Sequence, residues 1–202
     1  MANKIVVARY KEDISWTDKL DNVEIYNKGE VIDDTRHHQT LLDNFGREAH
    51  TYLFHIVDCY DDLDDITCFL QGDFFVHTNE HFPEYKMTRD NPNLKEDFEN
   101  VFFKNLENGF SKTHLTYPVD HFEDDSIIDW FKKEIDTNNL VDITKAKIFW
   151  GACFSVTREK IHSRSRDFYY KMFKQALSVP HFPWWAERSW YYILNNPENF
   201  NG

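Results

Sequence analysis

The segment from residue 46 to residue 77 constrains the fold more than any other part of the chain. Apolar residues between Ala49 and Tyr60 recur at spacings of three and four, which predicts an amphipathic helix. Four aspartates end this helix, and the apolar run at 66–70 after them predicts a buried strand. A strand, a helix and a strand at this spacing favour a right-handed parallel crossover, the unit from which open α/β sheets are built.

The rest of the chain predicts further elements of the same kind. Short β-branched runs predict strands at 5–8 and 23–26, and a short helix begins at Ser15. Residues 30–45 are polar and we expect them to be irregular, whereas 147–156 predict a strand pair or a bent strand broken at Gly151. Helices are predicted at about 94–106, 127–135, 158–177 (interrupted near Ser163) and 184–194. We therefore expect one α/β domain over 1–202, with a mostly parallel central sheet flanked by helices.

Composition restricts the class of partner. The chain has 202 residues, of which 41% are hydrophobic and 17% aromatic, as in a globular protein. A formal charge of −12 argues against nucleic acid and anionic membranes, since phosphate binding needs clustered lysine and arginine. Three scattered cysteines are typical of a reducing compartment. With neither a signal peptide nor a run long enough to span a bilayer, the sequence predicts a soluble, cytoplasmic protein.

Two short polar motifs flank the crossover. Gly46, Arg47 and Glu48 precede the helix, where backbone N–H groups and a guanidinium could hold phosphate or sugar hydroxyls. From these three residues alone, a glycine turn with Glu48 favouring the helix dipole is the favoured interpretation. Gln71-Gly72-Asp73 comes directly after the buried strand, and Asp73 is a candidate ligand for Mg²⁺ or Mn²⁺. The alternative is a turn in which Asp73 caps the next segment of the chain.

Two other motifs carry competing interpretations. The segment 77–81, HTNEH, matches the H-x-x-E-H pattern of inverted zinc peptidases, but Pro83 ends any helix there, and a solvated loop is the favoured interpretation. The segment 184–190, WWAERSW, is aromatic-dense with one carboxylate. Its aromatic faces would pack on sugar C–H faces with Glu187 as a general base, or its tryptophans would simply fill a core.

Five sequence blocks carry a family resemblance when they are taken in order. They are VVARYKEDISW, VEIYNKG, GREAHTYLFHIVDCYDDLDDITCFLQGDFFVH, WGACFSVTREKIHSRSRDFYYKMF and PWWAERSWYYIL. Together they resemble an uncharacterised domain family with members in fungi, algae and large DNA viruses. The resemblance covers nearly the whole chain and is weakest from about 80 to 145. That family in turn looks like a compact relative of the GT-A glycosyltransferases, which are Rossmann-related.

The GT-A resemblance implies roles for particular residues. It places the nucleotide-sugar donor against the ends of the first two strands and the start of the helix, and the metal at the end of a later strand. The implied donor-binding residues are Arg9, Tyr10, Asn27, Lys28, Gly46, Arg47, Glu48 and Gln71. Asp73, together with His77, would bind Mn²⁺ or Mg²⁺, although only the last residue of Gln71-Gly72-Asp73 matches the acidic D-x-D motif. Glu187 would be the catalytic base.

We therefore expect a hexosyl- or pentosyltransferase that moves a sugar from a UDP- or GDP-sugar donor to a glycan or other hydroxyl acceptor. A non-catalytic carbohydrate-binding or interaction module on the same fold is the first alternative, favoured by the incomplete D-x-D motif and the small size. A metal-dependent hydrolase built on HTNEH is the second.

Overall fold

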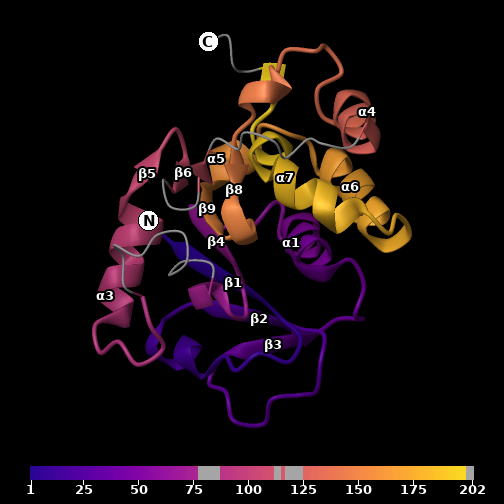
Figure 1. Cartoon of the computed structure of the whole chain (residues 1–202). Coiled ribbons are helices and arrows are strands. Elements are labelled where there is room, and N and C mark those ends of the chain that lie inside the picture. Colours follow the sequence, from indigo (N-terminus) through magenta and orange to yellow (C-terminus); the bar gives the residue numbers. More distant parts are fainter. Residues whose placement is uncertain (77–86, 112–114, 117–124, 199–202) are drawn as a thin grey trace.

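The computed structural model describes residues 1–76, 87–111, 115–116 and 125–198. Its centre is a seven-stranded sheet with the strand order β3-β2-β1-β4-β9-β6-β5 (Figure 1). β1 (Asn3–Arg9) lies between β2 (Val23–Asn27) and β4 (Ile66–Gln71) and is parallel to both, and β3 (His38–Leu41) is parallel to β2. The strands predicted at 5–8, 23–26 and 66–70 are confirmed.

The other half of the sheet is antiparallel, so the prediction of a mostly parallel sheet is wrong. β9 (Phe154–Thr157) pairs antiparallel with β4, β6 (Phe110–Ser111) with β9, and β5 (Leu106–Glu107) with β6. The chain is an α/β protein with a mixed sheet flanked by helices. The error arose because β5 and β6 are two residues long, too short for a periodic pattern, and because the strand predicted within 147–156 carried no information on its direction.

Helices pack on both faces of the sheet. One face, which includes Val6 and Phe69, packs against α1 (Arg47–Asp58), α4 (Asp125–Glu134), α6 (Arg166–Ser178) and α7 (Phe182–Leu194). The opposite face, which includes Val7 and Leu70, packs against η1 (Ser15–Lys19), α3 (Leu94–Phe98) and the π-helix η3 (Glu99–Lys104). Figure 1 shows α1, α6 and α7 together on one side and α3 on the other. Alternate residues of each strand thus enter different cores.

Most of the predicted helices are confirmed, with small shifts at their ends. The helix expected at 94–106 is divided into α3 and η3, and the break near Ser163 separates α5 (Arg158–Ile161) from α6. The segment expected to break at Gly151 does so: β8 (Ile148–Phe149) pairs with β7 (Leu115–Thr116) in a second small sheet. The turn η5 (Trp150–Ala152) then leads to β9, and η4 (Ile143–Lys145) precedes β8.

The polar segment 30–45 is not irregular throughout. β3 lies within it as a polar strand at the edge of the sheet, so the expectation for this segment is wrong in part. Among the described residues, no helix is both long and apolar enough to cross a membrane.

Candidate functional site

A cleft of about 200 Å³ opens where the parallel strands end. It lies beside the last residues of β1 and β4, the residue after β2 and the first turn of α1. Its lining residues are Ala8, Arg9, Tyr10, Glu12, Lys28, Asn44, Arg47, Glu48 and Gln71. The strands that follow β1 in the chain lie on both of its sides: β2 and β3 on one side, and β4 on the other. The carboxyl end of β1 is therefore a topological switch point of the sheet. Ligands of open α/β sheets bind at this kind of switch point, at the carboxyl ends of the strands.

The loops after β1 and β2 are held together beneath the cleft by an internal network. The Arg9 guanidinium donates to Asn27 Oδ1 at 2.8 Å and to the carbonyl of Glu30 at 2.8 Å. The Asn27 amide also accepts from the backbone N–H of Gly29 and donates to Gln39 and Glu30. Asn27 is buried and its hydrogen-bonding groups are used within the protein. It therefore supports the cleft from below and is not one of the residues that line it.

Gly29 permits the closest approach of these two loops. A Cβ atom at this position would lie 1.7 Å from the carbonyl oxygen of Tyr10. Only glycine fits there without moving one loop away from the other. The half-exposed Tyr10 ring is thereby fixed at the rim of the cleft, where it carries the Lys11 ammonium over its face at 4.9 Å.

Lys28 is a buried cation at the wall of the cleft. Its Nζ donates to the carbonyl of Phe45 at 2.6 Å and to the carbonyl of Arg47. A lysine ammonium has three donors, so one remains for a ligand in the cleft. Burial lowers the pKa of Lys28 to about 8, against the opposing effect of Glu48. The side chain is therefore a positive charge at neutral pH that an entering anion would stabilise.

The first turn of α1 has an unusual backbone. Gly46 and Arg47 have φ values of 58° and 49°, both in the left-handed region. Glycine is required at the first position, since a Cβ atom there would lie 2.5 Å from the carbonyl oxygen of Ala176 in α6. At Arg47 the same conformation is strained, and such strain in non-glycine residues is concentrated at functional sites. The side chain of Arg47 is 58% exposed, with its Nε 3.6 Å from Glu48 Oε2.

Two carboxylates lie close together near the start of α1. Glu48 is buried, which raises its pKa, while Arg47 lowers it and the nearby charge of Glu187 raises it further. Glu187 comes from α7 and is half-buried. Among the described residues, none forms a hydrogen bond or ion pair with the Glu187 carboxylate.

The turn after β4 closes the cleft on its other side. Gln71 lines the cleft and donates from Nε2 to the carbonyl of Gly151 at 2.7 Å. Gly72 lies against Glu12: a Cβ atom there would be 3.0 Å from Glu12 Oε2. That carboxylate oxygen accepts the backbone N–H of Tyr10 at 2.7 Å. Glycine at 72 therefore lets Glu12 cap the loop after β1.

Of the two predicted metal ligands, the structure describes Asp73 and pairs it with an arginine. Asp73 Oδ1 is 3.0 Å from the Arg89 guanidinium, which also contacts Asp13 Oδ2 at 3.3 Å. Asp73 does not line the cleft. No three His, Cys, Asp or Glu side chains in the described ranges are grouped to hold a metal ion. His77 and the whole HTNEH motif lie outside the described residues.

Six of the residues proposed for donor binding line the same cleft: Arg9, Tyr10, Lys28, Arg47, Glu48 and Gln71. Gly46 shapes it through the backbone, whereas Asn27, Asp73 and Glu187 lie outside its lining. Glu12 and Asn44 also line the cleft, although they are not among the residues proposed for donor binding. The acidic residue two positions after Tyr10 was the available signal for Glu12, while Asn44 lies in a polar stretch without one.

These features define an α/β protein with a polar cleft, lined by side chains of both charges, at the carboxyl edge of its parallel strands. The chain belongs to the family described as "Protein of unknown function (DUF3431)", whose model matches residues 5–200. No curated protein and no solved structure matches it.

Proposed function

We propose that this protein is a nucleotide-sugar-dependent glycosyltransferase of the GT-A type, a hexosyl- or pentosyltransferase. The observation that carries the proposal is the cleft itself, in which Lys28, Arg47 and the start of α1 converge at the switch point of the sheet. Backbone N–H groups at a helix start, an arginine fork and a lysine ammonium form a binding site for a diphosphate.

In this proposal the donor lies across the ends of the strands. Its diphosphate contacts Lys28 and Arg47, and its nucleoside stacks on or beside the exposed ring of Tyr10. Gln71 is held by the Gly151 carbonyl with its side-chain oxygen left as an acceptor for sugar hydroxyls. The internal pairing of Arg9 with Asn27 keeps the two nucleotide-facing loops in place before the donor arrives.

The transfer step then uses groups of this chain alone. The Glu187 carboxylate takes the proton from an acceptor hydroxyl as the acceptor oxygen forms a bond to the anomeric carbon of the donor. The bond from that carbon to the phosphate oxygen breaks, and its electron pair leaves with the diphosphate. Lys28 and Arg47 stabilise the charge that develops on this leaving group, which is usually the largest catalytic contribution. Because Asp73 is paired with Arg89, we assign no step to a metal ion.

The test is calorimetry with UDP- and GDP-sugars, with and without Mn²⁺, on the wild type and on Arg47→Ala. We expect one nucleoside diphosphate sugar to bind and Arg47→Ala to weaken it by about tenfold or more, since a charge-assisted hydrogen bond is worth about 1.5–3 kcal/mol. The control is Arg36→Ala, which removes an exposed arginine that is paired with Asp21 instead of lining the cleft. Failure of every nucleotide sugar to bind would refute the proposal.

A non-catalytic binding module on the same fold is the second candidate. The internal pairing of Asp73 favours it, because a transferase of this class normally uses a carboxylate there to bind its metal. The two are separated by donor turnover: a transferase releases nucleoside diphosphate when an acceptor is added, whereas a binding module does not. If binding occurs without release for every acceptor tested, the module becomes the better account.

A further inference from the structure

We infer that the groove beside Arg47 is an acceptor subsite that takes a sugar ring by stacking it on Phe45 and Trp184. The groove has a volume of about 370 Å³ and lies between the loop before α1 and the connection from α6 to α7. Its lining residues are Phe45, Gly46, Arg47, Ala176, Leu177, Ser178, Val179, Pro180, Pro183 and Trp184. This inference rests on the proposed transferase function and names the acceptor class for the same site.

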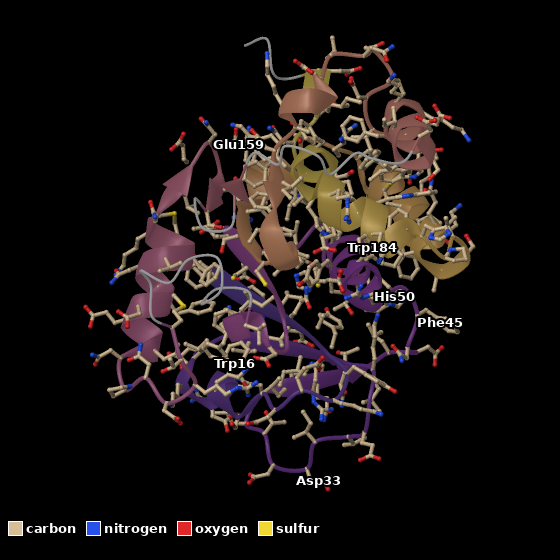
Figure 2. All side chains as sticks on the ribbon, in the orientation of Figure 1. Trp16, Asp33, Phe45, His50, Glu159 and Trp184 are labelled. Carbon is tan, nitrogen blue, oxygen red and sulfur yellow. The ribbon has the colours of Figure 1, made fainter. Side chains whose placement is uncertain are left out.

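The groove and the proposed donor cleft meet at one residue. Arg47 lines both, so a molecule in the groove and a donor in the cleft would meet at this side chain. Glu187 lies three positions after Trp184 in α7, and residues at that spacing are neighbours on a helix surface. A ring stacked on Trp184 would therefore lie next to the proposed base as well as the donor. Figure 2 shows Phe45 and Trp184 on the same side of the molecule.

Trp184 is held as a platform. Its side chain is 53% exposed, and the Arg188 guanidinium lies 4.3 Å from its ring centre on one face. The remaining tryptophans of α7 have core contacts instead: Trp185 stacks on Trp130 at 5.5 Å and Trp190 is fully buried. Both interpretations of the segment 184–190 therefore apply to part of it: Trp185 and Trp190 fill the core, and Trp184 is an exposed aromatic ring. An exposed ring fixed by a cation has its other face ready for a ligand at little entropic cost.

The shape and chemistry of the groove favour a sugar over an alkyl chain. Phe45 and Leu177 remain 53% and 45% exposed, so the groove covers only one side of whatever binds there. An alkyl chain would keep half of its apolar surface in water, which gives little binding energy. A pyranose ring has one continuous C–H face for the apolar wall and keeps its hydroxyls in water. Arg47 can then hold the one hydroxyl that points toward the donor.

The experiment is an NMR titration with saturation transfer, using methyl β-D-glucopyranoside and methyl β-D-galactopyranoside, with 1-hexanol as an alkyl probe. We expect at least one glycoside to bind with saturation of its ring C–H protons. Trp184→Ala and Phe45→Ala should each weaken it about tenfold, the equivalent of one aromatic contact. Tyr170→Ala is the matched control, since that aromatic ring is 48% exposed and is not among the residues that line the groove.

Two results would overturn the inference. One is that neither glycoside binds, with or without binding of 1-hexanol; the other is glycoside binding that Trp184→Ala and Phe45→Ala leave unchanged. Calorimetry of the donor on the same variants separates this failure from that of the proposed function. Intact donor binding with no sugar in the groove refutes only the acceptor subsite, whereas absent donor binding in the wild type refutes the transferase.

Discussion

The proposed role of Lys28 predicts that donor binding depends on pH, and the size of the effect follows from the pKa of this side chain. The pKa of this side chain is lowered to about 8 by burial, and an anion in the cleft binds the protonated form and raises that pKa. Affinity is therefore highest below pH 8 and falls as the pH rises through 8. With this pKa the lysine is roughly 90% charged at pH 7 and roughly 10% charged at pH 9. Donor affinity should fall about tenfold over this interval, or about 1.4 kcal/mol.

The assay is calorimetry at pH 7, 8 and 9 with whichever of UDP and GDP binds more tightly, on the wild type and on Lys28→Met. The ratio of the wild-type affinity to the Lys28→Met affinity does not depend on the ionisation of the ligand itself, because that ionisation affects both proteins equally. It should decrease about tenfold from pH 7 to pH 9 if Lys28 alone is responsible. Lys11→Met, which removes an exposed lysine from the neighbouring loop, is the matched control and should retain the wild-type pH dependence. A ratio that stays constant with pH would refute the reasoning.

Three further substitutions test other parts of the site. Glu187→Gln should lower transfer by about 10²–10⁴-fold while donor affinity is kept, as measured by nucleotide release and calorimetry; full activity would contradict its role as base. Burial raises the pKa of Glu48, so the native state keeps a proton that the unfolded chain releases, and the free energy of unfolding falls as pH rises through that window. Glu48→Gln should therefore raise the melting temperature at pH 7 more than at pH 4. The control, Glu159→Gln, changes an exposed carboxylate (Figure 2) and should leave the melting temperature unchanged at both pH values. Equal melting temperatures for Glu48→Gln and the wild type would contradict this prediction. Gly29→Ala forces a Cβ atom to within 1.7 Å of the Tyr10 carbonyl and should lower the free energy of unfolding in urea by about 1–3 kcal/mol; an unchanged unfolding midpoint would show that the loops separate freely.

The sequence predicted the parallel half of the fold because its signals are long and periodic. The helix at α1 and the strands β1, β2 and β4 each carry a clear apolar pattern, and a strand, a helix and a strand in succession favour parallel strands. β5 and β6 were missed because two residues are too few to show a period, and the strand predicted within 147–156 did not reveal that β9 pairs antiparallel with β4. β3 was missed because an edge strand with half-exposed side chains has a polar sequence like that of a loop.

The candidate site was predictable in position but not in the roles of individual residues. Polar residues after parallel strands must lie at one edge of the sheet, which is why Tyr10, Lys28 and Gln71 come together. An asparagine at the end of a strand has the same neighbours in the sequence whether its side chain binds a ligand or a neighbouring loop. The internal hydrogen bonds of Asn27 therefore could not be predicted. The pairing of Asp73 with Arg89 depends on a contact between segments distant in the chain, which no local pattern records.

The central claim is that a nucleoside diphosphate binds in the cleft at the start of α1. A crystal structure of the protein soaked with the nucleoside diphosphate that binds in calorimetry tests this most directly. The account predicts phosphate density in contact with Lys28 Nζ and the Arg47 guanidinium, at the ends of β1, β2 and β4. Density for the nucleotide at any other surface, with this cleft empty, would contradict it.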